Sequence, residues 1–203
     1  METRSAAIFI LAAALAAGCL AAPAQPAAPA QQGSAIQFPK APVAYSASYV
    51  VDEGGAQAVK RVWASGSNMR IEIADEGGGF FSLYFLGSRA YSCGKTGQGT
   101  SCFDVTGRAQ AGLESFLPCQ HLENAKKAGS VDVGGTEGAC YYVPYGVFGK
   151  RKICCTDMGV LAYDSYNLTS GKAHVEYLSE IAYGASAADF ALPAEPAMAP
   201  PEG

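Results

Sequence analysis

Histidine is almost absent from this sequence, and so are the other groupings that enzymes use to move protons. Only His121 and His174 occur, Ser115 lies outside a Gly-x-Ser-x-Gly elbow, and the carboxylates are scattered without a paired motif or a calcium-binding loop. Acid–base catalysis needs titratable groups placed close together. We therefore expect no enzymatic activity, no catalytic residues, no metal site and no cofactor, and we interpret both histidines as solvated or structural.

Positive charge is also scarce. The chain has 14 lysines and arginines against 18 aspartates and glutamates, which gives a formal net charge of −4 at pH 7. A surface that binds nucleic acid needs a net basic stripe, so we expect no nucleic-acid partner. The most compact basic cluster is Lys150-Arg151-Lys152. We interpret it as the solvated end of a strand, and contact with anionic lipid is the less favoured alternative.

Only one long apolar run is present, from Ala6 to Gly18, directly before Cys19. The run is too short to span a bilayer as an ordinary helix and is typical of an export signal. Its end, Leu15-Ala16-Ala17-Gly18-Cys19, resembles a lipoprotein signal, in which Cys19 is acylated and becomes the first residue of the mature chain. We predict a signal peptide over residues 1–18 and an extracytoplasmic, lipid-anchored protein. The alternative is a soluble secreted protein, cut after Ala24.

Cysteines, in contrast, are numerous. Six of the seven follow the export signal: Cys93, Cys102, Cys119, Cys140, Cys154 and Cys155. An even number in an exported domain indicates disulfides. Cys93 and Cys102 flank a glycine-rich turn and are expected to pair across a hairpin. Cys154 and Cys155 are neighbours on one expected strand, so their side chains point to opposite faces. Their partners should then be Cys119 and Cys140, in either order, and a bond between the two neighbours is the less favoured alternative.

Alternating apolar and polar residues indicate strands in the rest of the chain. The alternation is clear over residues 45–51, 69–73, 81–85 and 173–183, and glycine-rich turns separate the runs. In the last run we expect Ala173, Val175, Tyr177, Ser179, Ile181 and Tyr183 on the packed face. His174, Glu176 and Glu180 alternate with them on the wetter face. Residues 19–42 form an Ala/Pro-rich linker. We expect one β-rich domain over residues 43–193 and a disordered tail over residues 194–203.

One stretch departs from this alternation. Between Arg108 and Lys127, apolar residues recur at helical spacing and Pro118 interrupts them. The spacing predicts two short helices, long enough to cover one face of a curved sheet. The expected fold class is therefore mainly β with a short helical insertion (α+β), in which about ten strands form a strongly curved antiparallel sheet, or half β-barrel, with a helical lid.

The order of the strand motifs is familiar. They read Met69-Arg70-Ile71-Glu72-Ile73, then Phe81-Ser82-Leu83-Tyr84-Phe85-Leu86-Gly87-Ser88-Arg89-Ala90-Tyr91, then Thr156-Asp157-Met158-Gly159-Val160-Leu161-Ala162-Tyr163-Asp164-Ser165, and finally Asp189-Phe190-Ala191-Leu192-Pro193. This layout resembles the LolA/LolB-like group of outer-membrane lipoprotein sorting proteins and related lipid-carrying lipoproteins. Members of that group fold as an incomplete β-barrel around a hydrophobic cavity, with helices as a lid. The resemblance implies that this chain holds an acyl chain or another apolar ligand.

Aromatic and aliphatic residues in the expected strands are the candidates for lining such a cavity. They are Tyr49, Trp63, Ile71, Phe81, Leu83, Phe85, Tyr177 and Ile181. Our interpretation is a non-catalytic envelope protein that binds a hydrophobic ligand, with the membrane contacted through its lipid anchor. The alternative is a structural or partner-binding envelope lipoprotein with a fully packed core and no ligand. Asn167-Leu168-Thr169 is a glycosylation sequon, which makes Asn167 a candidate acceptor.

Overall fold

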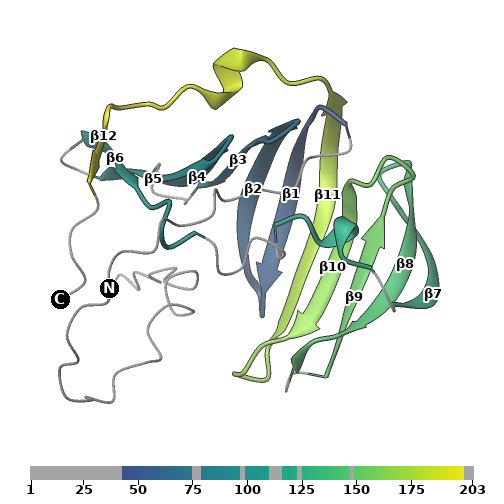
Figure 1. Cartoon of the computed structure of the whole chain (residues 1–203). Helices are drawn as coiled ribbons and strands as arrows, with labels where there is room; N and C mark the ends of the chain where they lie inside the picture. The colour runs from purple at the N-terminus through teal and green to yellow at the C-terminus, as the bar shows by residue number, and fades with distance from the viewer. Residues whose placement is uncertain are drawn as a thin grey trace, which may run out of the picture. The chain divides into compact units, whose positions relative to one another are not determined.

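The computed structural model describes residues 43–74, 79–96, 99–109, 116–122, 125–146 and 149–198 (Figure 1). Cys19, the expected signal peptide and the expected linker lie outside this part of the chain. Of the two units of the chain, Met1–Ser34 and Ala35–Gly203, every described residue belongs to the second. Within the described residues, no helix has the length and apolar character needed to cross a membrane.

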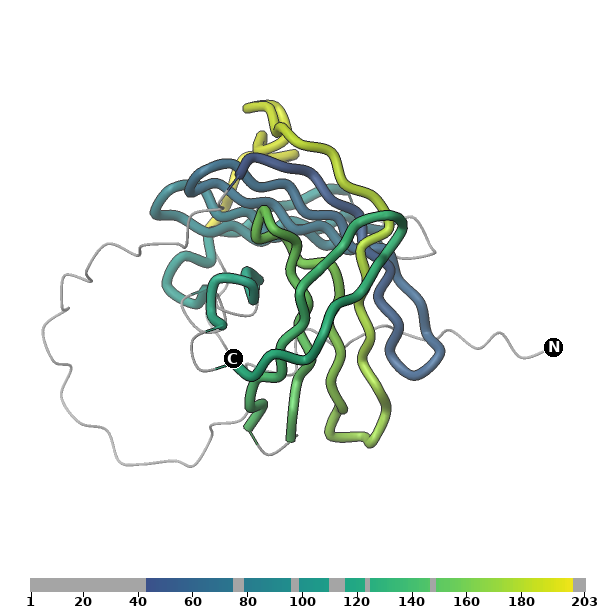
Figure 2. Tube along the Cα trace, turned by 90° about the vertical axis from the view of Figure 1, so that its right-hand side faces the viewer, coloured from purple at the N-terminus to yellow at the C-terminus, as the bar shows by residue number. Residues whose placement is uncertain are grey.

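A single sheet of twelve strands forms the domain, in the order β12-β6-β5-β4-β3-β2-β1-β11-β10-β9-β8-β7. The strands are β1 (Tyr45–Glu53), β2 (Ala56–Ser65), β3 (Asn68–Ala74), β4 (Phe80–Leu86), β5 (Arg89–Thr96), β6 (Gly99–Asp104), β7 (Lys126–Val133), β8 (Thr136–Pro144), β9 (Lys150–Cys155), β10 (Leu161–Asn167), β11 (Ala173–Tyr183) and β12 (Pro196–Met198). All neighbours are antiparallel except β12, which runs parallel to β6. The sheet is strongly curved and does not close (Figure 2), so the expected mainly β class and curved sheet are confirmed.

Tight turns join most consecutive strands. Gly66, between β2 and β3, has φ of 57°, and Gly87, between β4 and β5, has φ of 64°. Only glycine adopts this left-handed conformation without a steric penalty, and such turns match the twist of the strands they join. The chain therefore runs as two series of hairpins, β1–β6 and β7–β11. The pairing of β1 with β11 joins the two series.

The expected helical lid is wrong for the residues that the structure describes. Between Arg108 and Lys127, the described segments contain one short 3₁₀ turn, Pro118–Gln120, and Lys126 already begins β7; residues 110–115 and 123–124 are not described. Pro118 disfavours helix in the preceding residue, and Leu117 has non-helical φ and ψ of −126° and 60°. The segment nevertheless lies inside the curve of the sheet (Figure 2).

The face that β11 buries differs from the expected one. Its first half buries His174, Glu176 and Leu178, not the apolar residues that alternate with them. The register then shifts opposite Ser48 and Tyr49, and beyond this bulge Ile181 is the residue that packs against the core. A β-bulge inserts one residue and re-aims the side chains that follow. The residues of one alternating series therefore point to one side of the sheet before the bulge and to the other side after it.

The C-terminal segment crosses the convex face of the sheet. A short 3₁₀ helix, η5 (Ala187–Phe190), is closed by a capping box between Ser186 and Asp189. Leu192 then packs against a small buried cluster formed by Tyr84, Tyr91, Cys93 and Cys102. Pro196–Met198 pairs with β6 as β12, within the tail that we expected to be disordered from residue 194.

Three disulfides join elements of the domain. Cys93 and Cys102 link β5 to β6, Cys140 and Cys154 link β8 to β9, and Cys119 is bonded to Cys155. The expected hairpin bond and the different partners of the two neighbouring cysteines are confirmed. Both hydrophobic clusters and all three disulfides of the described residues lie within residues 43–198, so a chain that begins at residue 20 retains them.

Candidate functional site: the concave face of the sheet

Side chains from four neighbouring strands form an apolar half of the concave face. Its buried members are Tyr45, Ala47 and Tyr49 on β1, Val62 and Ala64 on β2, Met69 and Ile71 on β3, and Phe85 on β4. They share a face because they occupy alternate positions and are paired in register, as in Ala47–Val62 and Val62–Ile71. Aromatic and aliphatic side chains of this kind suit both a packed core and an apolar ligand site.

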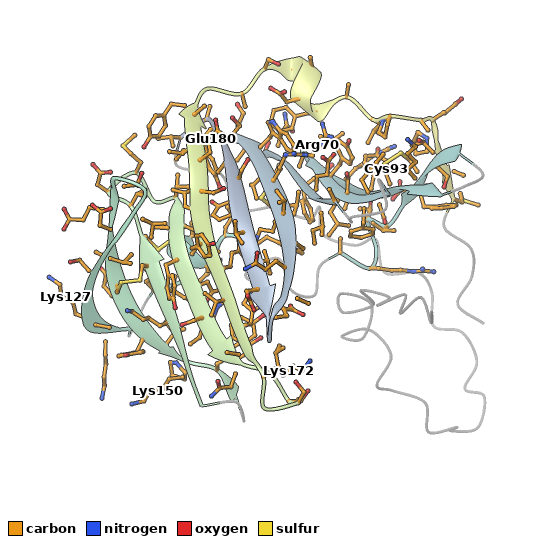
Figure 3. All side chains as sticks on the ribbon, turned by 180° about the vertical axis from the view of Figure 1, so that it is seen from behind. Arg70, Cys93, Lys127, Lys150, Lys172 and Glu180 are labelled. Carbon is orange, nitrogen blue, oxygen red and sulfur yellow. A yellow bond between two sulfur atoms is a disulfide. The ribbon has the colours of Figure 1, made fainter. Side chains whose placement is uncertain are left out.

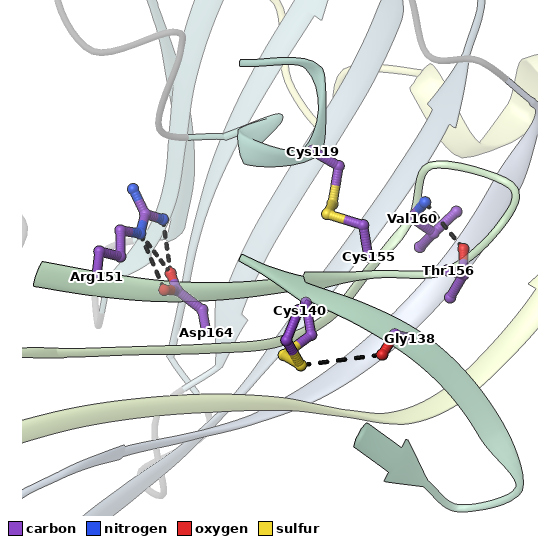
Figure 4. The surroundings of a disulfide bond; sticks show 9 residues. Cys119, Gly138, Cys140, Arg151, Cys155, Thr156, Val160 and Asp164 are labelled. Carbon is purple, nitrogen blue, oxygen red and sulfur yellow. Dashed lines mark hydrogen bonds and ion pairs between the residues drawn. A yellow bond between two sulfur atoms is a disulfide. The ribbon is translucent and has the colours of Figure 1, made fainter. Parts of the chain in front are cut away.

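A segment of the chain already covers this apolar half. Residues 105–109 and 116–122, here called the cover, place Val105, Ala109, Phe116, Leu117 and Leu122 in the same hydrophobic cluster. The ring of Phe116 lies 5.6 Å from that of Phe85. Cys119 ties the cover to the end of β9 through its bond to Cys155 (Figure 4). The cover is thus part of the core and is held to the sheet covalently.

Little space remains beneath the cover. The cavity between Tyr45, Tyr49, Lys60 and Leu117 has a volume of about 10 Å³. A volume of this size holds about one water molecule, whereas sites for small organic ligands measure roughly 300–1,000 Å³. This cavity, which described residues line, is therefore too small to enclose an acyl chain.

The eight cavity candidates lie in different places. Tyr49, Ile71 and Phe85 are buried in the core of the concave face, and Leu83 and Ile181 pack against it. Phe81 faces the same way but lies at the start of β4 and is 39% exposed.

Trp63 and Tyr177 lie on the opposite, convex face. Trp63 is paired in register with Ser46 and Arg70, and it lines a shallow hollow of about 140 Å³ together with Arg61 and Glu180. Tyr177 is paired with Val50 and Tyr163. Asn167, the candidate glycosylation site, is exposed at the end of β10.

A polar half adjoins the apolar half on the same face. It consists of Glu53, Lys60, Arg151, Asp164, His174 and Glu176. The guanidinium group of Arg151 donates to both carboxylate oxygens of Asp164, at 2.6–3.0 Å (Figure 4). Nδ1 of His174 lies 3.0 Å from Glu53 and its Nε2 lies 3.9 Å from Glu176. Glu176 also pairs with Lys60 at 2.5 Å.

Burial and pairing set the charge states in the polar half. Burial disfavours the imidazolium form, but the interactions of His174 with Glu176 and Glu53 outweigh it, so the pKa of His174 is raised. Burial likewise disfavours the carboxylate of Glu176, but the positive charge of Lys60 outweighs it and the pKa of Glu176 is lowered. The ring of Tyr166 stacks on the His174 ring, with 4.5 Å between the two centroids, and covers one side of the imidazole.

The polar half was not predicted from the sequence. Its residues come from β1, β2, β9, β10 and β11, and no local motif joins them. The one available signal was the pair His174 and Glu176 at alternate positions of β11, which we assigned to the wetter face. The charges are paired with one another, and the described residues contain no group of three or more histidine, cysteine or acidic side chains placed to hold a metal ion. The arrangement is suited to fixing neighbouring strands.

Comparison with known proteins finds no matching family model and no matching curated protein. Among solved structures, the chain is similar to MucB, with 14% identity and a TM-score of 0.51 over 75% of this chain and 58% of MucB. The MucA/MucB complex of Pseudomonas aeruginosa matches with 12% identity and a TM-score of 0.49, over 73% of this chain and 55% of that chain. A LolA superfamily protein of Nitrosomonas europaea matches with 7% identity and a TM-score of 0.38, over 77% of this chain and 93% of that chain.

These similarities concern the fold. At 14% identity, the match to MucB shows a likeness of fold alone. The chain spans 58% of the length of MucB.

Proposed function

We propose that the chain is an exported, lipid-anchored and non-catalytic binding protein of the cell envelope, which contacts a partner through its surface and does not enclose a lipid. One observation carries the proposal: the cavity between the described part of the cover and the apolar half measures about 10 Å³. A half-barrel that carries a lipid needs either an open cavity or a cover that can move away from the apolar face of the sheet. Here the bond between Cys119 and Cys155 opposes the departure of the cover.

A second candidate function is the binding of an acyl chain after the cover has left. The apolar character of the residues beneath the cover supports it, since Tyr45, Met69, Ile71 and Phe85 would face such a ligand. This candidate requires the Cys119–Cys155 bond to open, or residues 105–122 to move around it.

Native mass spectrometry with lipid extraction separates the two candidates. The protein is residues 20–203, exported into an oxidising compartment, because this part keeps the whole described sheet. We expect the mass of the bare polypeptide and no change of melting temperature with added fatty acid. Co-purified acyl lipid in this protein would overturn the proposal of a packed domain.

A disulfide variant tests the role of the cover directly. Cys119→Ala/Cys155→Ala frees one end of the cover, and Cys93→Ala/Cys102→Ala is the matched control that leaves it tied. Fatty acid bound by the first variant, but not by the control or the unchanged protein, would favour the second candidate. Absence of binding in all three agrees with surface contact as the function.

A further inference from the structure

The convex face of β7–β10 carries an unusual set of side chains. Register places Lys126 of β7 beside Tyr142 of β8, and Tyr142 beside Lys152 of β9. Lys150 follows at the next position of the same face. Tyr163 of β10 is paired with Cys154, two residues beyond Lys152. We call Lys126, Tyr142, Lys150, Lys152 and Tyr163 the Lys/Tyr face.

Solvent reaches these side chains. Lys126 and Lys150 are exposed, Tyr142 is 43% exposed, and Lys152 and Tyr163 are partly exposed. The ammonium group of Lys150 lies 5.9 Å from the centre of the Tyr142 ring, and that of Lys152 lies 5.6 Å from the Tyr163 ring. The rings thus form a platform on which the lysine chains rest, with their charges at its surface.

Acidic side chains are excluded from this face. Strands β7–β10 contain three carboxylates, Asp132, Glu137 and Asp164. Register puts Asp132 opposite Glu137, and both alternate with the residues of the Lys/Tyr face. Asp164 points to the concave side and is neutralised by Arg151. A protein with a net charge of −4 therefore presents a local surface of positive charge, which attracts anions.

The platform continues across the sheet. Tyr163 is paired with Tyr177, Tyr177 with Val50, and Val50 with Val59, so a row of partly exposed or exposed apolar side chains extends from the Lys/Tyr face. Lys172, in the turn before β11, adds a positive charge at the end where Lys150 lies (Figure 3). In the described residues, the C-terminal segment covers only the part of the convex face beyond β2.

We propose that the Lys/Tyr face docks the domain on an anionic lipid surface. Lysine and tyrosine are the side chains suited to a headgroup region, because each has an apolar body and a polar tip. Residues 20–42 join the domain to the expected anchor at Cys19. A linker of this length spans roughly 25 Å as a coil and roughly 70 Å as extended polyproline. The anchor would keep the face at high local concentration near the membrane, so a few charges suffice.

Vesicle flotation of residues 20–203 tests this proposal, since this chain lacks the cysteine to which an acyl group would be attached. The probes are vesicles of phosphatidylcholine alone and of phosphatidylcholine mixed with phosphatidylglycerol. We expect binding to the mixed vesicles only, weakened by salt. The variant Lys126→Gln/Lys150→Gln/Lys152→Gln should lose affinity by about fivefold for each lysine removed.

The matched control is Arg89→Gln/Lys95→Gln/Arg108→Gln, which removes the same charge from other exposed positions. It should bind as the unchanged protein does. Equal losses of vesicle affinity in the two triple variants would mean that net charge alone causes the binding, and would overturn the proposal. Absence of binding to the mixed vesicles would also overturn it and leave an acidic protein surface as the partner class. Circular dichroism of each variant verifies that the sheet is retained.

Discussion

His174 stands between two carboxylates on the concave face, and its protonation links three strands. Glu53 lies on β1, Glu176 lies on β11 beside it, and Tyr166 of β10 stacks on the ring. The protonated imidazole donates a hydrogen bond to Glu53 and forms an ion pair with Glu176, whereas the neutral ring loses the charge that attracts both carboxylates. The residue is only 7% exposed, so water does little to replace the lost interaction.

The raised pKa of His174 predicts that the domain loses stability as pH rises above about 6.5. A group whose pKa is higher in the folded state stabilises that state fully below its unfolded value, about 6.5, and ceases to do so as pH rises through the folded value. Urea unfolding between about pH 5 and pH 9 should show this loss in the unchanged protein and a flatter curve in His174→Gln. A variant with the same slope as the unchanged protein would rule out His174 as its source.

The lowered pKa of Glu176 acts at the other end of the pH range. Its contribution is present above the unfolded value, near 4.5, and is lost as pH falls through the lower folded value. The two groups together place the most stable range in weakly acidic solution, where Glu176 is charged and His174 is still protonated.

At the scale of strands, β8 approaches β10 closely at Gly138, because glycine has no side chain. A Cβ at Gly138 would lie 2.9 Å from the Cβ of Ala162 and 3.4 Å from the carbonyl oxygen of Cys155. Gly138→Ala should therefore destabilise the domain by about 1–3 kcal/mol, as overpacking of a core does, measured by urea unfolding.

Gly107→Ala is the control for this substitution. A Cβ there meets no heavy atom within 4 Å, so its cost should be small or even negative, because alanine restricts the unfolded chain. Equal destabilisation by the two substitutions would contradict the role of close packing at Gly138.

The strands could be predicted from the sequence because alternation and glycine turns are local properties. The bond between Cys93 and Cys102 is local too, since both flank one hairpin turn. The facing of His174 and Glu176 was not predictable, because it depends on Glu53, Lys60 and the bulge opposite Ser48. The helical spacing between Arg108 and Lys127 includes Phe116, Leu117 and Leu122, which pack on the sheet. Pro118 ends any helix in the described part of the cover.

At the scale of the whole chain, the expected anchor at Cys19 has a direct test. Cys19→Ser removes the thiol that is acylated, so the exported protein should lack the added acyl mass. It should also move from the membrane pellet to the soluble fraction when the wash contains high salt, which screens the Lys/Tyr face. Mass spectrometry of both forms supplies the measurement. Identical masses of the two N-terminal peptides, apart from the substitution, would favour the plain secretory signal.

The pairing of β1 with β11 determines when the domain can fold. Ser179 donates a hydrogen bond to the carbonyl of Ser48 across 131 residues of sequence, and this seam alone joins the two hairpin series within the sheet. Contacts so distant in sequence form late, because the chain entropy lost in closing the loop comes first. During synthesis, β1 therefore cannot pair until β11, near the end of the domain, has been made. The export that we expect would therefore act on a chain whose two hairpin series are not yet joined.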